Sequence, residues 1–501
     1  MVFWKTCLAA MAAFLLTACS GEERRPDPVK LASNPAELVF ETAGGTLEVS
    51  ITTSIKPTVS CTDSWVSLKE GSFGSNTFKL SVTAGENTGT GSRSTSIRVA
   101  GDKQNLTIPV TQKGVPSIPV APTTALTPEI VFEAMAPGWN MGNQMDAING
   151  SVSGETAWGN PKCTQATMNG VKAAGFKAVR ICVTWEGHVG AAPGYRIEDK
   201  WLDRVAEIVG YAETAGLVAI VNTHHDETHW QDISKAYKDA DRNEKVKAEM
   251  AALWTQIAQR FKDKGDWLVF ESVNEIQDGG WGWSEDFKKN PDAQYKVLNE
   301  WNQVFVDAVR ATGGNNATRW LGIPGYAANP GFTIKGLKLP EDHTDANRLM
   351  VAVHDYDPFD YTLKDPLVRQ WGHTADPDKR VSSNDEQAVV AVFDNLKSAY
   401  LDKGIPVYLG EMGCSRHEDA DFPYQKYYME YFCKAAADRN LPMFLWDNGA
   451  TGIGPERHGY IDHGTGKLVD GKARELVDLM VKAVSEKSSS YTLESVYKSA
   501  P

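Results

Sequence analysis

Two glutamates follow apolar, strand-like runs at distant points of this 501-residue chain. Glu275 closes the run LVFESVNE at 268–275, and Glu411 lies in PVYLGEMG at 406–413. The carboxyl ends of the strands of a parallel barrel converge on one face, where active sites are built. Two converging carboxylates are typical of glycoside hydrolysis, in which one is the acid/base and the other a nucleophile or base. The sequence therefore predicts catalysis by Glu275 and Glu411.

Polar or aromatic side chains also end most of the other strand-like runs. They are Asn143, Arg180, His224, His225, Asn274, His354, Tyr356 and Trp446, with Asp146 shortly after the first of them. A polar residue at one strand end is weakly informative. Side chains of catalytic type at the majority of the strand ends indicate one shared site. The alternative for the two adjacent histidines is a hydrogen-bonded structural pair. No metal site is expected, because the chain has no HExxH motif or carboxylate triad to support one.

Strand-like and helical patterns alternate over residues 125–489. The strand-like runs are 138–143, 178–185, 218–225, 268–275, 318–326, 349–356, 406–413 and 442–449, and most are apolar on both faces, as buried parallel strands are. Between most of them, apolar residues recur at three- and four-residue spacing. A doubly wound sheet would also alternate, but no GxGxxG opens the first unit. The pattern predicts an α/β fold, a (β/α)8 TIM barrel with loop insertions.

A small all-β domain is expected before the barrel. Residues 35–114 hold short strand-like runs separated by turn formers, with no helical period, which is typical of an immunoglobulin-like sandwich. The Pro-rich stretch 115–124 predicts an extended linker. Residues 490–501 are expected to form a C-terminal tail. The stretches SWVSL and IPVTQKG resemble a BACON domain, which we interpret mainly as a spacer.

The strand-end residues of the barrel resemble glycoside hydrolase family 5 over nearly the whole second domain. The NE pair at 274–275, HxY at 354–356 and Glu411 carry the resemblance, although the Pro usual after NE is Ile276 here. GWNMGN, TAWGNP and VNTHHD are similar to the endoglucanase and xyloglucanase subgroup of the family, subfamily 4. The resemblance implies a retaining endo-β-1,4-glucanase that needs no cofactor.

The resemblance also implies a role for each residue. Glu275 is expected to be the general acid/base and Glu411 the nucleophile. A retaining enzyme places its two carboxyl groups about 5–5.5 Å apart. Because two carboxyl groups at that distance cannot both ionise easily, the pKa of Glu275 should rise. Arg180 and Tyr356 are expected to hold Glu411. His354 is expected to orient Glu275. The expected sugar contacts are Asn274 at the 2-hydroxyl, Trp446 as the floor of the sugar site before the bond, and Asn143, Asp146 and His225 at the next sugar outward.

Tryptophans suggest where the polymer lies. The chain has 15 Trp, and an indole can stack on the apolar face of a sugar ring. Six fall on predicted loops or strand ends: Trp158, Trp185, Trp230, Trp281, Trp283 and Trp371. We expect at least three to stack on glucosyl units, Trp158 and Trp283 among them; the alternative is that each packs its own loop. A wide aromatic cleft favours a branched polymer such as xyloglucan, with mixed-linkage glucan, cellulose and mannan as alternatives.

The first 19 residues are a targeting segment. A short region with one Lys precedes an apolar run too short to span a membrane, and LTACS then resembles a bacterial lipobox with Cys19 as the lipidated residue. The alternative is an ordinary signal peptide with an incidental Cys. SGEE follows Cys19 and resembles a surface-export signal of Gram-negative lipoproteins. We expect a lipid-anchored protein facing outward from the outer membrane, with residues 20–34 as a tether.

Net charge and cysteine count exclude some classes of protein. The net charge of −13 gives no basic patch for nucleic acid, so nucleic-acid binding is excluded. The expected partner is a β-glucan polysaccharide, and the enzyme is expected to be a monomer. Five Cys remain after Cys7 and Cys19, without metal or redox spacing, and an odd count argues against a disulfide framework. Two other classes stay open: an inactive hydrolase kept as a glycan-binding lipoprotein, and a structural or adhesion protein.

Overall fold

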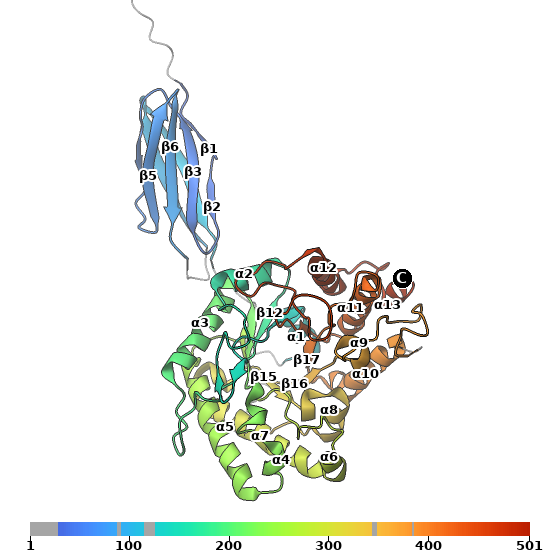
Figure 1. The fold of residues 1–501 in the computed structure, drawn as a ribbon. Coiled ribbons are helices and arrows are strands. Elements are labelled where there is room, and N and C mark those ends of the chain that lie inside the picture. Colours follow the sequence, from blue (N-terminus) through green and yellow to red (C-terminus); the bar gives the residue numbers. More distant parts are fainter. Residues whose placement is uncertain (1–28, 88–91, 115–125, 343–347, 383–384) are drawn as a thin grey trace, which may run out of the picture. The chain divides into compact units, whose positions relative to one another are not determined.

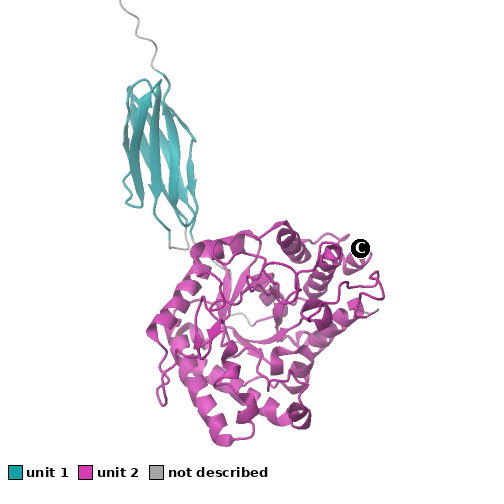
Figure 2. Ribbon diagram, viewed as in Figure 1, with its two compact units in different colours: residues 1–114 teal, residues 115–501 magenta. Residues whose placement is uncertain are grey.

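The computed structural model describes residues 29–87, 92–114, 126–342, 348–382 and 385–501 (Figure 1). The chain divides into two compact units, residues 1–114 and 115–501 (Figure 2). The signal segment with Cys19 and the predicted linker 115–124 lie outside the described residues.

The first unit is a sandwich of two four-stranded sheets. One sheet has the order β1 (Ala32–Asn34), β3 (Gly45–Thr52), β6 (Thr77–Ala84), β5 (Val66–Gly74). The other has the order β2 (Leu38–Phe40), β8 (Gln104–Gln112), β7 (Arg93–Gly101), β4 (Thr58–Ser60). Alternate residues of β6 are buried, as expected for strands with one face on a core. The tether prediction was wrong for Ala32–Asn34, because this segment pairs with Ser50–Thr52 of β3.

The second unit contains the predicted eight-stranded parallel barrel. In order around the barrel the strands are β9 (Gly138–Met141), β12 (Ala178–Ile181), β13 (Val218–Val221), β14 (Leu268–Glu271), β15 (Leu321–Pro324), β16 (Leu349–His354), β17 (Val407–Met412) and β18 (Met443–Leu445). β18 pairs with β9 and closes the ring. Every residue of these strands is buried, which explains their apolar sequences.

Helices surround the barrel (Figure 1). The longer ones are α2 (Gln165–Ala173), α3 (Asp199–Ala215), α5 (Ala240–Arg260), α7 (Pro291–Ala311), α10 (Asp385–Ala399), α11 (Phe422–Ala437) and α12 (Gly471–Ser485). Before the first barrel strand, α1 (Pro128–Met135) shares a core cluster with residues that begin β12 and β13. This contact closes the amino-terminal end of the barrel, so the opposite end is the open one.

The barrel strands end earlier than the sequence predicted. β14 stops at Glu271, so Glu275 lies in the loop four residues beyond it. Arg180, His354 and Glu411 lie near the ends of their strands, and the other polar site residues lie on the loops that follow at the carboxyl end of the barrel. The predicted C-terminal tail was also wrong in part. Residues 493–497 form α13 (Leu493–Tyr497), whose Val496 is buried in the main core.

Within the described part of the chain, no helix is long and apolar enough to cross a bilayer. The five cysteines found there, Cys61, Cys163, Cys182, Cys414 and Cys433, are free thiols, and the last four are buried.

Candidate active site

A cavity of about 740 Å³ opens at the carboxyl end of the barrel strands. Nine of the predicted site residues line it: His224, His225, Asn274, Glu275, Trp283, His354, Tyr356, Glu411 and Trp446. They come from loops after β13, β14, β16, β17 and β18, or from the last residues of those strands. The barrel therefore brings together residues that are up to about two hundred positions apart in the sequence.

Glu275 lies in an environment that favours its protonated form. Its Oε1 is 2.6 Å from Nδ1 of His354, and its side chain is 18% exposed. Burial raises the pKa of Glu275 to about 7, and burial lowers the pKa of His354 to about 4. Gly410 leaves room for this imidazole, because a Cβ there would lie 3.0 Å from Nε2 of His354. Between these two pKa values the carboxyl holds a proton beside a neutral imidazole.

Glu411 is held by two hydrogen-bond donors. Nη1 of Arg180 donates to Oε1 at 2.8 Å, and the hydroxyl of Tyr356 donates to Oε2 at 2.9 Å. Burial raises the pKa of Glu411, whereas His354, Arg180 and the Tyr356 hydroxyl act in the opposite direction. Hydrogen bonds to the charged form are what a carboxylate needs to remain ionised in a buried site.

The two carboxyl groups are close neighbours. Carboxylate oxygens of Glu275 and Glu411 and a ring nitrogen of His354 all lie within 4.8 Å of one another. At this distance the ionisation of one carboxyl raises the pKa of the other, so the pair titrates as a unit. The arrangement offers one protonated and one ionised carboxyl to a bond placed between them.

A buried network that the sequence analysis missed lies beneath this pair. Arg180 donates to Glu271 through Nη2 at 2.7 Å and to Asn274 Oδ1 at 2.6 Å. Glu271 also accepts hydrogen bonds from Asn222 and from the Tyr408 hydroxyl. The only sequence signal for Glu271 was a carboxylate inside the otherwise apolar strand LVFE. Such a residue is rarely fully buried unless it is paired.

The histidines lie beside Asp146, which has a supporting position. Asp146 is fully buried and accepts hydrogen bonds from the backbone N–H of Asn143 and of Gln144. Its Oδ2 is 3.8 Å from Nε2 of His225. Burial lowers the pKa of His225, but Glu227, Asp146 and Glu275 outweigh it and raise that pKa to about 9. His225 is therefore a cation at neutral pH, at the edge of the cavity.

The structure separates the tryptophans into two groups. Trp185, Trp230 and Trp371 are buried at 0%, 7% and 0% exposure, so of the six tryptophans Trp158, Trp281 and Trp283 remain for stacking on sugar. The Trp371 indole packs against Tyr427 and Tyr428 of α11. Trp158, Trp281 and Trp283 are exposed, and the last two line the cavity. Trp158 lies against His225, with ring centroids 5.6 Å apart.

Trp446 directly follows β18 and lies beside His224. Its ring is parallel to that of His224, with centroids 5.9 Å apart, and it lines the cavity although little of it is exposed. A flat indole held in this way presents one face to the cavity.

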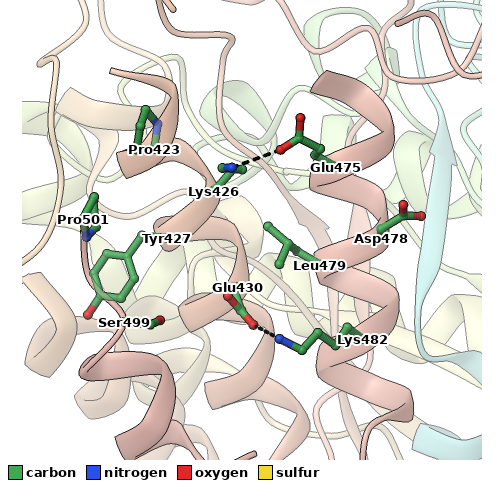
Figure 3. Close-up of a pocket in the computed structure, with 10 residues that line it drawn as sticks. All are labelled: Pro423, Lys426, Tyr427, Glu430, Glu475, Asp478, Leu479, Lys482, Ser499 and Pro501. Atoms are coloured by element: carbon green, nitrogen blue, oxygen red, sulfur yellow. Dashed lines mark hydrogen bonds and ion pairs between the residues drawn. The ribbon is translucent and has the colours of Figure 1, made fainter. Parts of the chain in front are cut away.

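A second hollow of about 440 Å³ lies between α11, α12 and the C-terminal residues (Figure 3). Its walls carry the ion pairs Lys426–Glu475 at 3.0 Å and Lys482–Glu430 at 2.7 Å. These charged groups are paired with one another and none of them was predicted as a site residue. We therefore place the active site in the first cavity, where the two predicted glutamates meet.

Comparisons with known proteins agree with this geometry. Residues 140–452 match the family described as Cellulase (glycosyl hydrolase family 5). Residues 53–113 match BACON, described as a putative binding domain. Endoglucanase A of Paenibacillus barcinonensis is 34% identical over 351 residues, which cover 67% of this chain and 85% of that protein.

Solved structures are also similar to the chain, and two of them bear on its substrate. A GH5-4 broad specificity endoglucanase from Bacteroides salanitronis has a TM-score of 0.71 and 50% identity, and the match covers 74% of this chain and 99% of that one. A Bacteroides ovatus GH5 xyloglucanase in complex with a XXXG heptasaccharide has a TM-score of 0.64 and 27% identity. That match covers 91% of this chain and 99% of the other.

Proposed function

Because this chain belongs to glycosyl hydrolase family 5 and is an enzyme that hydrolyses β-glucans, we propose that it is a retaining endo-β-1,4-glucanase that cleaves xyloglucan. The observation that carries the proposal is the approach of the Glu275 and Glu411 carboxylates to within 4.8 Å. Retaining enzymes hold the two carboxyl groups about 5–5.5 Å apart, whereas inverting enzymes leave room for a water between them.

The two glutamates have different tasks in the first step. Glu275, whose pKa is raised to about 7, gives its proton to the oxygen of the glycosidic bond as that bond breaks. Glu411 attacks the anomeric carbon from the other side and forms a covalent glycosyl ester. Arg180 and Tyr356 keep the attacking oxygens oriented through the hydrogen bonds described above.

The second step reverses these tasks. Glu275, now ionised, takes a proton from a water molecule as that water attacks the anomeric carbon. The ester bond to Glu411 breaks, the carboxylate is released, and the sugar leaves with its original configuration. Glu275 ends the cycle protonated, so no proton is gained or lost by the enzyme.

The exposed aromatic side chains support a branched substrate. Trp283, Trp281 and Phe359 are 75%, 52% and 56% exposed and line the cavity, so a polymer can rest on them from the solvent side. The similarity to a GH5 xyloglucanase points the same way. Mixed-linkage β-glucan is the second candidate, because the chain is more similar to a broad specificity endoglucanase, at 50% identity, than to that xyloglucanase, at 27%.

Hydrolysis of a panel of soluble polymers tests both parts of the proposal. We expect reducing ends from xyloglucan at a higher kcat/KM than from mixed-linkage glucan or carboxymethyl cellulose, and none from mannan. Proton NMR of the first product should show the β-anomer. An initial α-anomer would refute retention, and a clear preference for mixed-linkage glucan would replace xyloglucan as the substrate.

The location of the enzyme is a separate proposal that rests on sequence alone. The lipobox at LTACS would attach lipid to Cys19, and SGEE would direct the protein to the outer face of the outer membrane. This location fits the substrate, since a polysaccharide must be cut before it can enter the cell.

A further inference from the structure

The geometry points to Glu271 as a positioning residue that orients Arg180 and, together with the Val183 backbone N–H, holds the Asn222 amide that selects the tautomer of His224. Glu271 is 1% exposed and lies at the end of β14, below the catalytic pair. The inference rests on the proposed function, because the groups that Glu271 orients are those around the nucleophile.

All three nitrogens of the Arg180 guanidinium donate hydrogen bonds. Nε lies 3.1 Å from Oε1 of Glu271, and Nη2 lies 2.7 Å from the same oxygen. The remaining donors reach Glu411, Asn274 and Asn140. Because Glu271 takes one whole edge of the planar guanidinium, the opposite edge can reach only Glu411 and its neighbours.

Hydrogen bonds fix which way the amide of Asn222 faces. Its Oδ1 accepts from the backbone N–H of Val183 at 3.1 Å, so Nδ2 must face the other way. Nδ2 donates to Oε1 of Glu271 at 3.0 Å and lies 3.2 Å from Nδ1 of His224. A donor facing Nδ1 requires that this nitrogen be the acceptor, so the proton of a neutral His224 is on Nε2.

That proton has a defined direction. Nε2 of His224 is 4.0 Å from Oδ2 of Asp146 and 4.0 Å from Oε1 of Glu411, too far for a direct hydrogen bond to either. Burial lowers the pKa of His224 well below its usual range, so the ring is neutral. The N–H therefore points into the space between those carboxylates, where a sugar hydroxyl next to the nucleophile can accept it.

The charge of Glu271 acts on Glu275 directly and on Glu411 through Arg180. Burial raises the pKa of Glu271, but Arg180 outweighs this effect and keeps it ionised. Its negative charge offsets Arg180 and raises the pKa of Glu275. Without that charge, Arg180 would lower the pKa of both Glu411 and Glu275. The other ionisable groups that face the pair are Glu227, His224, His225, His354, Tyr356 and Glu456.

The variant Glu271→Gln tests this role in the full-length enzyme. We expect kcat/KM on xyloglucan to fall about tenfold or more, because hydrogen bonds to charged groups are lost. Both limbs of the pH profile should move toward lower pH by about half a unit or more, since the acid limb follows the ionisation of Glu411 and the basic limb that of Glu275. The matched control is Glu155→Gln, a buried carboxylate that pairs with Arg204 away from the cavity, which should leave both limbs in place.

A second measurement does not depend on the folding of Glu271→Gln. Long-range proton–nitrogen correlation spectra of wild-type enzyme labelled with ¹⁵N-histidine distinguish the two neutral tautomers. His224, assigned by its loss in His224→Gln, should show the Nε2–H form, and Asn222→Leu should produce a mixture of the two forms.

The outcomes separate the inference from the proposed function. A Glu271→Gln enzyme with the wild-type profile, or with lower kcat but unmoved limbs, would overturn the inference, since mere packing loss leaves the pKa values unchanged. An Nδ1–H tautomer of His224 in the wild type would also overturn it, even if the variant fails to fold. Absence of glucan hydrolysis by the wild-type enzyme would instead refute the proposed function.

Discussion

Replacing Glu275 with Gln should abolish hydrolysis of the polymer and, at neutral pH, stabilise the fold. The carboxyl has an ordinary pKa of 4.5 in the unfolded chain and a pKa of about 7 in the folded protein. Above pH 4.5 the unfolded state releases this proton more easily than the folded state does, so stability falls as the pH rises through this window. Gln cannot ionise, so the variant does not lose this stability as the pH rises.

The size of the effect follows from the two pKa values. Each pKa unit corresponds to about 1.4 kcal/mol, so full ionisation of Glu275 costs about 3 kcal/mol of folding free energy. The side chain is only 18% exposed, so solvent screening does not remove this cost. For a domain of this size, 3 kcal/mol corresponds to a rise in Tm of about 4 °C. The Gln side chain can keep the hydrogen bond to Nδ1 of His354.

Thermal unfolding of the wild type and of Glu275→Gln at pH 4.5 and pH 8 measures the effect. The two Tm values should coincide at pH 4.5 and differ by about 4 °C at pH 8. The matched control is Glu285→Gln, whose carboxylate is 77% exposed on α6 (Glu285–Lys289) and should not alter the Tm difference. Equal Tm values at pH 8, or the same gain at both pH values, would refute the assigned pKa and its role in catalysis.

Five further variants have expected outcomes. Glu411→Gln should lose about a thousandfold in kcat on polymer and on activated aryl glycosides alike. Glu275→Gln should retain activity on aryl glycosides, whose leaving group needs no proton; equal cleavage by both variants would contradict the roles. Trp283→Ala should raise KM for xyloglucan roughly tenfold with an unchanged Tm, because stacking is lost from a largely exposed side chain; an unchanged KM would exclude contact with substrate. Deleting residues 20–124 should leave turnover on soluble glucan unchanged, as the two units are separately compact; a large loss in a folded remainder would show that the sandwich contributes. Cys19→Ala should move the protein out of the membrane fraction, and protease treatment of intact cells should digest the wild type; protection until the cells are broken would place it inside.

The sequence predicted those parts of the protein that depend on local pattern. Runs that are apolar on both faces, such as 218–221, must have both faces covered, so their alternation with amphipathic segments indicates a barrel surrounded by helices. The same rule places Glu275 and Glu411 at one face, because parallel strands all end on the same side. The short alternating strands of the sandwich follow from a period of two.

Other features depend on contacts that no local pattern contains. Whether Trp371 packs inside its loop or faces sugar depends on the tyrosines of α11 that surround it. Residues 493–497 read as a tail, yet Val496 is buried because α13 meets α11. In both cases the apolar surface that covers the segment comes from a distant part of the chain.

The buried network shows the same limit most clearly. Glu271 and Arg180 are 91 residues apart, and Arg180 and Glu411 are 231 residues apart. The sequence by itself determined that charged groups stand at the strand ends. Only the closed barrel decides which of them meet, because a buried charge is tolerated when its partners arrive from neighbouring strands with the right geometry. The raised pKa of Glu275 and the fixed orientation of Arg180 therefore belong to the tertiary structure, since desolvation and pairing arise only when those strands close.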